Sequence, residues 1–257
     1  MLERVQHSAG TLTSKVSRWQ GVEAVLLGEA AEIDRYDPYF SIDLFVFHRL
    51  ALPAAEERIV ELTGTAAFES SGVQVADRFL FDELPVTLSY YQIDKLDSTL
   101  ARAEERLWAL RESGTKMLYR LQRGHPLHQS SGWLQQARGR LEQLPESFWH
   151  AIILSARAAL EVDLRYINAA VHRQDDLIYL SASATFVHNV ISFLFAYNRQ
   201  FESSGRLLQE RLRALPRLPD GFLGRLDAFV RSDSELGPQQ KREIAELIAR
   251  SVFELSD

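Results

Sequence analysis

The pattern of apolar residues changes character near residue 130. From Ser130 onward the sequence is typical of one helix after another, separated by proline, glycine or polar breaks. Two of these segments, Glu146–His172 and Leu177–Arg199, are joined by a short polar turn, so we expect them to form the central antiparallel pair of a bundle. The residues that we expect their apolar faces to bury are Ile153, Leu160, Leu164, Val190, Leu194 and Phe195.

Before residue 130, short β-like runs mix with helical segments. The run Val22–Leu27 ends at a glycine, and the run Ser41–Phe47 alternates in character, so both are predicted strands. Alternation places Ser41, Asp43 and Phe45 on one face of the second strand and its aliphatic residues on the other.

The other elements of the first half are predicted from the same signals. We expect helices at residues 1–19, Pro53–Leu62 and Ser98–Arg111, and strands at Val73–Phe81, Val86–Tyr91 and Met117–Gln122. We expect turns through Asp82, Glu83 and Pro85 and through Gly124-His125-Pro126. The prediction is therefore an α+β protein. A mixed sheet with helices occupies residues 1–125, and an all-helical bundle occupies residues 126–257.

The charged residues are distributed unevenly. Residues 1–120 carry 19 acidic and 13 basic side chains, whereas residues 121–257 carry 16 of each, so the whole net charge of −6 belongs to the first half. Binding to a nucleic-acid backbone requires clustered cations that displace counterions. The acidic first half therefore disfavours nucleic acid as a partner.

Cysteine is absent, which excludes disulfides, thiolate catalysis and thiolate metal sites. We assign none of the seven histidines to a metal. The most apolar run, Phe186–Tyr197, contains polar residues and is shorter than the ~20 residues of a membrane helix, so we expect a buried helix and no membrane partner. The chain begins with a polar, amphipathic segment, and we expect a cytoplasmic protein whose oligomeric state the sequence leaves open.

A strand that ends in glycine, a loop and a second strand with an inward aspartate form the central motif of the first half. These pieces are Leu26-Leu27-Gly28-Glu29 and Ser41-Ile42-Asp43-Leu44. The motif resembles the nucleotidyltransferase superfamily, in particular the kanamycin-nucleotidyltransferase-like group, whose catalytic domain is followed by a helical bundle. The resemblance implies a catalytic metal ligand at Asp43 and nucleotide binding at Gly28, Glu29, Ser41 and Thr87.

The resemblance continues in the second half. Arg173-Gln174-Asp175, the apolar stretch that follows, Ala196–Phe201 and Arg206 are similar to a pattern of uncharacterised nucleotidyltransferase-like proteins with that helical domain. It implies a polar cluster of the second domain, formed by Arg173, Asp175, Asn198 and Arg199. Polar residues that cap the two central helices explain the same positions equally well, and both interpretations stay open.

The implied chemistry explains why departures from the family pattern matter. In-line phosphoryl transfer needs two divalent ions held by about three carboxylates. Here Glu29 replaces the family's serine after Gly28, Ser41 replaces the first aspartate of its Asp-x-Asp pair, and Thr87 replaces its third carboxylate. Asp43 remains, which implies a weakly held Mg²⁺. The acidic residues that lie nearby in sequence and could compensate are Glu29, Asp34, Asp37 and Asp82.

Two functions follow from this count of ligands. We favour a nucleotidyltransferase-like pseudoenzyme that binds nucleotide or a partner in a cleft between its domains without efficient catalysis. The alternative is an active enzyme that moves a nucleoside monophosphate from a nucleoside triphosphate to a hydroxyl of a small molecule or protein. A purely structural role also stays open for Asp43, as a strand-end aspartate bonded to loop amides, and for Gly28, as a strand-terminating glycine.

Overall fold

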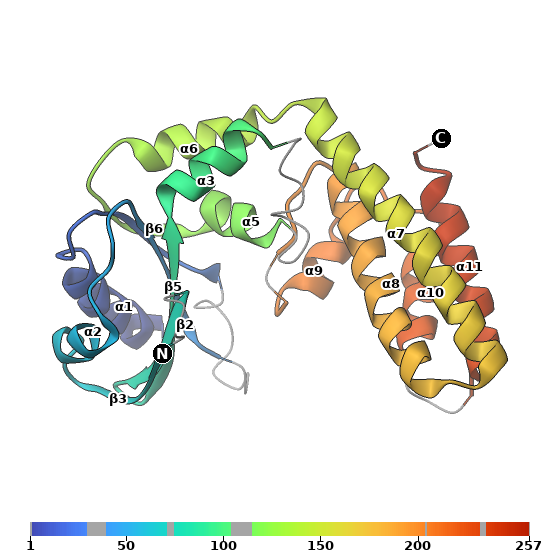
Figure 1. Ribbon diagram of the computed structural model, residues 1–257, viewed down its shortest axis with the longest axis horizontal. Helices are drawn as coiled ribbons and strands as arrows, with labels where there is room; N and C mark the ends of the chain where they lie inside the picture. The colour runs from blue at the N-terminus through green and yellow to red at the C-terminus, as the bar shows by residue number, and fades with distance from the viewer. Residues whose placement is uncertain are drawn as a thin grey trace. The chain divides into compact units, whose positions relative to one another are not determined.

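The computed structural model describes residues 2–29, 40–70, 75–103, 115–203, 205–231 and 235–256 (Figure 1). The chain contains two compact units, and the boundary between them falls between Leu144 and Pro145. The first unit holds a six-stranded sheet with helices, and the described part of the second unit is helical. The α+β class expected from the sequence is confirmed.

The first unit is built on a mixed sheet with the strand order β3-β4-β5-β2-β1-β6. Strands β2 and β5 pair in parallel, and the other neighbouring strands pair antiparallel. The strands are β1 (Val22–Leu27), β2 (Ile42–His48), β3 (Thr65–Ser70), β4 (Ala76–Phe81), β5 (Leu84–Gln92) and β6 (His125–Gln129). The helices are α1 (Leu2–Val16), α2 (Ala55–Glu61), α3 (Ile93–Ala101), α5 (Lys116–Arg123) and α6 (Trp133–Glu142).

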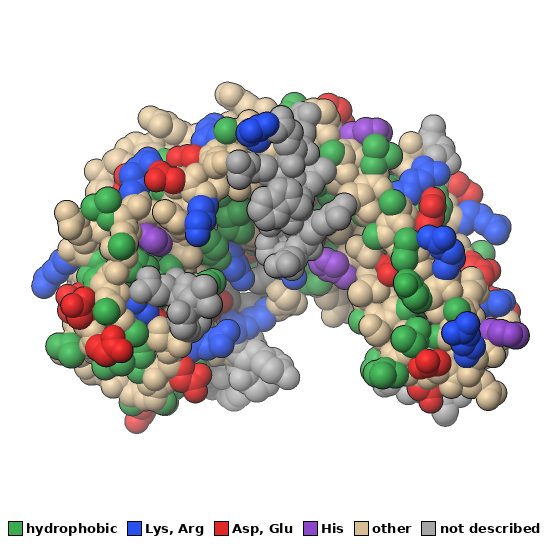
Figure 2. Space-filling view, in the orientation of Figure 1, with side chains coloured by type: hydrophobic (Ala, Val, Ile, Leu, Met, Phe, Trp, Pro, Cys, Tyr) green, Lys and Arg blue, Asp and Glu red, His purple; other side chains and the backbone are tan. Residues whose placement is uncertain are grey.

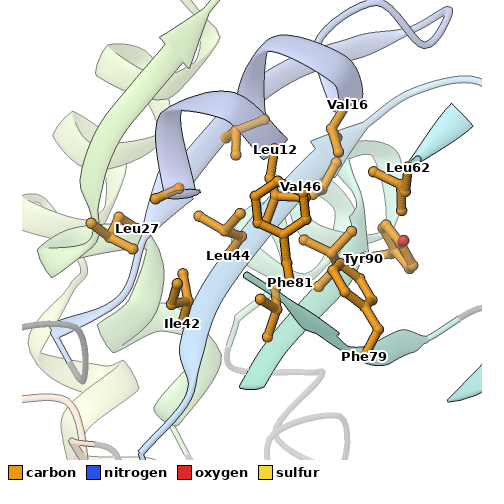
Figure 3. Close-up of a cluster of buried hydrophobic side chains, with 14 of the residues drawn as sticks. Leu12, Val16, Leu27, Ile42, Leu44, Val46, Leu62, Phe79, Phe81 and Tyr90 are labelled. Carbon is orange, nitrogen blue, oxygen red and sulfur yellow. The ribbon is translucent and has the colours of Figure 1, made fainter. Parts of the chain in front are cut away.

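One face of the sheet packs against α1 (Figure 3). Ile42, Leu44 and Val46 of β2 share a buried cluster with Leu12 and Val16 of α1. These β2 residues alternate along the strand, so the residues between them turn to the opposite face. This core thereby fixes which side chains of β2 are available on the other side of the sheet.

Most predicted elements of this unit are confirmed. The strand Val22–Leu27 has the expected bounds, and the helices near residues 1–19 and 53–62 and the strand at 41–47 differ by a few residues at their ends. The strands expected at 73–81 and 86–91 are β4 and β5, although residues 73 and 74 lie outside the described residues. Helix α3 begins earlier than the expected Ser98, and residues 104–111 of that predicted helix lie outside the described residues.

The predicted turn between β4 and β5 is confirmed at Asp82 and Glu83, which form a two-residue hairpin, whereas Pro85, also expected in the turn, lies within β5 and pairs with Leu80. Asp82 and Glu83 have φ values of 49° and 61°, and the flanking residues Phe81 and Leu84 pair across it. Positive φ at both central residues is the backbone of a type I′ turn, whose twist matches that of the strands. The Asp82 carboxylate accepts a hydrogen bond of 3.3 Å from Ser8 of α1, so it lies on the α1 side.

Two predictions near residue 120 are wrong. The segment expected as a strand, Met117–Gln122, lies in α5, and the turn expected at 124–126 leads directly into the edge strand β6. A segment of six residues with mixed apolar character fits the period of a strand and that of a helix equally well. The Arg138 guanidinium stabilises the helix, because it donates to the carbonyls of Leu121 (3.0 Å) and Gly124 (2.5 Å) at the end of α5. Pro126 is tolerated in β6 because this strand lies at the sheet edge.

The second unit is organised around α7 (Glu146–Arg173) and α8 (Asp176–Tyr197), which pack antiparallel as predicted (Figure 1). Asp163 of α7 accepts hydrogen bonds from Thr185 (2.9 Å) and Asn189 (2.7 Å) of α8. Helices α9 (Leu208–Arg213), α10 (Phe222–Val230) and α11 (Pro238–Phe253) complete the unit. Of the six apolar residues expected in this core, four are buried and two, Ile153 and Leu164, are partly buried against it.

The burial of helix α8 changes along its length. Its second half carries the run Phe186–Tyr197 and is buried as expected, whereas Leu177 and Leu180 in its first turns are 78% and 70% exposed. By length and composition α8 could cross a membrane, since it has 22 residues and its most apolar stretch of 18 residues has a mean hydropathy of 1.5. Of that stretch, 33% is buried inside the protein. Hydrophobic side chains are also visible on the surface of the helical unit in Figure 2.

Gly124 joins α5 to β6 at a point of close approach. A Cβ atom there would lie 2.7 Å from the Arg120 carbonyl oxygen and 2.9 Å from Leu26 Cβ. We therefore expect Gly124→Ala to lower the free energy of unfolding by about 1–3 kcal/mol, measured by chemical denaturation. The matched control is Gly139→Ala in α6, where an added Cβ meets nothing within 4 Å and should be neutral or slightly stabilising. Equal stability of the two variants would contradict the close packing at Gly124.

Candidate functional site

Four of the five residues predicted for the site of the first domain lie together on the face of the sheet opposite α1, and the fifth, Glu29, follows β1 beside them. Asp43 of β2 is the register partner of Thr87 of β5. Ser41 Oγ and Thr87 Oγ1 are 3.1 Å apart and share a hydrogen bond. The Gly28 amide donates to the Asp43 carbonyl oxygen at 2.8 Å. These four residues, which we call the Asp43 face, form one continuous surface across three neighbouring strands.

Gly28 lies where β1 closely approaches this surface. A Cβ atom on Gly28 would lie 3.1 Å from two atoms of the Phe45 ring and 3.3 Å from Asp43 Cβ. Side chains at this distance must shift by a few tenths of an ångström to make room. The absence of a side chain at Gly28 therefore lets the end of β1 lie directly beside Asp43.

Helix α5 contributes two side chains beside the Asp43 face. The Tyr119 hydroxyl donates to the Glu29 carboxylate just after β1. The Arg120 guanidinium lies over the Phe45 ring, 5.0 Å from its centroid, and its Nη1 donates to the Tyr91 hydroxyl at 2.6 Å. Phe45 in turn lies against Gly28, so Arg120 is held at the border of the Asp43 face.

Arg78 of β4 lies on the other border. It is the register partner of Thr87, as Asp43 is on the opposite side of β5, so Arg78, Thr87 and Asp43 form one row across three strands. Cross-strand neighbours have Cβ atoms about 5 Å apart on the same face. The Arg78 side chain is exposed and makes no hydrogen bond or ion pair with the described part of the chain.

Sequence reasoning did not select either arginine. A signal for Arg78 exists, because it alternates with the buried residues Asp77 and Phe79 and so must turn to the face opposite α1. Arg120 could not be placed, because its segment was predicted as a strand and is a helix.

Among the described residues, the donor set of the Asp43 face does not by itself make a two-metal site. Asp43 supplies its one carboxylate, and the hydroxyls of Ser41 and Thr87 bond to each other. Across the residues described, no group of three or more histidine or acidic side chains is arranged to hold a metal ion. Of the four residues expected to compensate, Glu29 is bonded by Tyr119, Asp82 lies on the α1 side, and Asp34 and Asp37 lie outside the described residues.

A pocket of about 710 Å³ opens at the end of β1. Gly28 and Glu29 line it together with Arg123, His125 and Arg138 from the region of α5, β6 and α6. Val5 and Gln6 of α1 also line it, so the pocket lies at the edge of the sheet beside α1. Arg138 is held by the carbonyls at the end of α5, and burial lowers the pKa of its guanidinium. The pocket therefore combines the end of the predicted nucleotide motif with cationic side chains.

The four polar residues predicted in the second domain do not form one cluster, which corrects that expectation. Arg173 and Asp175 lie where α7 meets α8, and Asn198 and Arg199 follow the other end of α8. A helix of this length separates its ends by about 33 Å, since each of its 22 residues adds about 1.5 Å.

Two of these residues cap α8. The Asp175 carboxylate accepts a hydrogen bond of 3.0 Å from the Ile178 amide at the N-terminus. At the C-terminus the Asn198 side-chain amide donates to the Leu194 carbonyl at 2.8 Å and to the Arg217 carbonyl at 2.9 Å. Its oxygen accepts a hydrogen bond of 2.9 Å from the Arg217 amide. Their geometry is that of helix capping, which is the alternative interpretation given by the sequence.

Comparison with known proteins gives similarities to a family and to solved structures. The family described as "Domain of unknown function (DUF4037)" matches residues 111–204, which is less than half of the chain. Among solved structures, the chain is similar to a nucleotidyltransferase-like protein from Exiguobacterium sibiricum 255-15, with 10% sequence identity, a TM-score of 0.49, and coverage of 97% of this chain and 74% of that one. No curated protein matches the sequence.

Proposed function

We propose that the first unit is a nucleotidyltransferase-like pseudoenzyme of the kanamycin-nucleotidyltransferase-like group, which binds a nucleoside triphosphate on the Asp43 face without efficient catalysis. The observation that carries the proposal is the hydrogen bond between Ser41 and Thr87 beside Asp43. At the two positions where the family resemblance implies carboxylates, this chain has hydroxyls that satisfy each other. A Mg²⁺ ion brought in with the nucleotide would meet one carboxylate of this face, that of Asp43.

The surroundings of the Asp43 face support a ligand rather than a purely structural role. Its polar groups lie on the face of the sheet opposite the α1 core, next to arginine side chains. A pocket beside α1 shares Gly28 with the Asp43 face and is large enough for a small molecule. We also propose that the protein is cytoplasmic.

The proposal predicts the outcome of a turnover assay. Purified protein with Mg²⁺ and each of the four nucleoside triphosphates should release no more pyrophosphate than a mock preparation, because one carboxylate does not hold two ions. Asp43→Asn should leave this background unchanged, and an active nucleotidyltransferase serves as the positive control. Pyrophosphate release that Asp43→Asn abolishes would instead establish the active enzyme, with Glu29 and Asp37 as the next ligands to test.

A further inference from the structure

We infer that the Asp43 face binds the phosphates of its nucleotide through Arg78 and Arg120, and that binding therefore needs no divalent metal ion. The inference rests on the proposed nucleotide binding and specifies its chemistry. In a metal-dependent site, carboxylates hold the ions and the ions meet the phosphates. Here the described residues do not supply the ligands for two metal ions, yet a triphosphate still needs cations to offset its negative charge.

Arg120 is positioned as an anion-binding group at one border of the face. Its guanidinium is fixed by the stacking on Phe45 and by the hydrogen bond to Tyr91, which leaves little side-chain freedom to lose when a ligand binds. Its Nε is buried and has no hydrogen-bond partner among the described residues. A buried donor of this kind gains free energy when an acceptor arrives.

Arg78 provides the second cation at the opposite border. It shares a row with Thr87 and Asp43, and its long side chain is free of ion pairs within the described residues. Its other register partner, Glu69 of β3, is exposed and forms no ion pair with it. Arg78 is thus available to a ligand that lies over Ser41 and Thr87.

The two arginines replace the function of metal ions in a specific chemical sense. A guanidinium presents several donors in a planar fork that matches phosphate oxygens, and it stays charged at any physiological pH. Arg78 and Arg120 bring two positive charges to the borders of a face that carries the negative charge of Asp43, with Glu69 and Glu29 nearby. One of the Ser41 and Thr87 hydroxyls donates to the other, and the second keeps its own proton to donate to a phosphate oxygen. Two carboxylates at these positions would instead repel the phosphate.

The test is a calorimetric titration of the full chain with ATP, in parallel with Mg²⁺ and with excess EDTA. We expect dissociation constants that agree within about threefold in the two buffers, and no binding of adenosine. Arg120→Gln should weaken ATP binding at least about tenfold in EDTA, and Arg78→Gln should weaken it severalfold, because charge-assisted hydrogen bonds are lost. The matched control is Arg18→Gln, an exposed arginine that follows α1, which should bind as the wild type does.

Each outcome decides at least one of the two proposals, the nucleotide binding and its independence of metal. Binding that requires Mg²⁺ overturns the metal-free inference and leaves the proposed function standing, whereas no ATP binding in either buffer overturns both. Metal-free binding that survives both arginine substitutions would show that other cations hold the phosphates, and our assignment would be wrong. Arg78 is exposed and has no ion pair with any residue that the structure describes, so its variant should fold even if Arg120→Gln loses packing against Phe45. Circular dichroism checks the folding of both variants.

Discussion

Asp77→Asn is expected to lower the free energy of unfolding by about 3–5 kcal/mol, which is one of the largest effects that this structure predicts for a single substitution. Asp77 of β4 and Arg58 of α2 are both 0% exposed, and the two form a bidentate ion pair with N–O distances of 2.7 and 2.8 Å. The substitution removes the negative charge and leaves the Arg58 guanidinium charged in the core. That uncompensated charge, rather than the lost contact alone, causes the large effect.

The network around this ion pair is fully connected. The Tyr90 hydroxyl donates to Asp77 at 2.5 Å, and Arg58 also donates to the Pro53 carbonyl (2.7 Å) and the Ser70 hydroxyl (2.8 Å). It ties α2 to strands β3, β4 and β5 on the α1 side of the sheet. The partners of Arg58 in these elements therefore rely on the orientation of its guanidinium for their hydrogen bonds.

The same pair predicts a dependence on pH. Burial alone would raise the pKa of the Asp77 carboxyl, but hydrogen bonds from Arg58, Tyr90 and Ser70 outweigh it and hold the pKa below its ordinary value. A depressed carboxyl pKa stabilises the fold above the unfolded-state value of about 3.9, and this contribution is lost as the pH falls through the folded-state pKa. The stability difference between wild type and Asp77→Asn should therefore shrink below about pH 4.

Urea denaturation of both proteins at several pH values measures these effects. The control is Asp227→Asn, which removes an exposed ion pair with Arg231 and should cost less than about 1 kcal/mol. A loss at Asp77 as small as that at Asp227 would contradict the buried pair.

The double substitution Ser41→Asp with Thr87→Asp is expected to raise the affinity for Mg²⁺ at least about tenfold. The two hydroxyl oxygens are 3.1 Å apart and Thr87 lies beside Asp43, so the new carboxylates would converge with the existing one. Three carboxylates supply the charge and the oxygen ligands that Mg²⁺ prefers. Calorimetric titration with MgCl₂ measures the gain.

Arg78 is the nearest competitor for the new carboxylate at position 87, because the two positions are register partners. The titration should therefore be repeated in an Arg78→Gln background, where the gain should increase. The single variants Ser41→Asp and Thr87→Asp serve as controls and should each bind Mg²⁺ more weakly than the double variant. No gain in the double variant in either background would mean that these residues do not mark the site.

The sequence predicts the parts of the fold whose periodicity is long or clear. Glu146–His172 and Leu177–Arg199 are long helical segments, and the glycine that ends Val22–Leu27 marks its boundary, so these elements are confirmed closely. Short segments at the sheet edges are different. Strand β3 has no clear signal in the sequence, because its residues TAAFES are mostly exposed and lack the apolar alternation of a strand. The strand also has a bulge, with a φ of 51° at Ala67.

The candidate site was predictable only along the strands. The pattern Ser41-x-Asp43 and the alternation of Val86–Tyr91 predict that Asp43 and Thr87 can share a face, and their register pairing places them side by side. Arg120 reaches this face from a helix about 77 residues later in sequence, and tertiary packing rather than local pattern determines that segment's conformation. The expected cleft between the domains stays a prediction.

The measurement that tests the central claim most directly is photo-crosslinking of the full chain with an azido derivative of ATP, followed by peptide mapping. If the Asp43 face binds nucleotide, the label should fall on peptides that contain β2, β5 or α5, and excess unmodified ATP should compete it away. Label confined to the helices of residues 145–256, or label that ATP does not displace, would contradict the account.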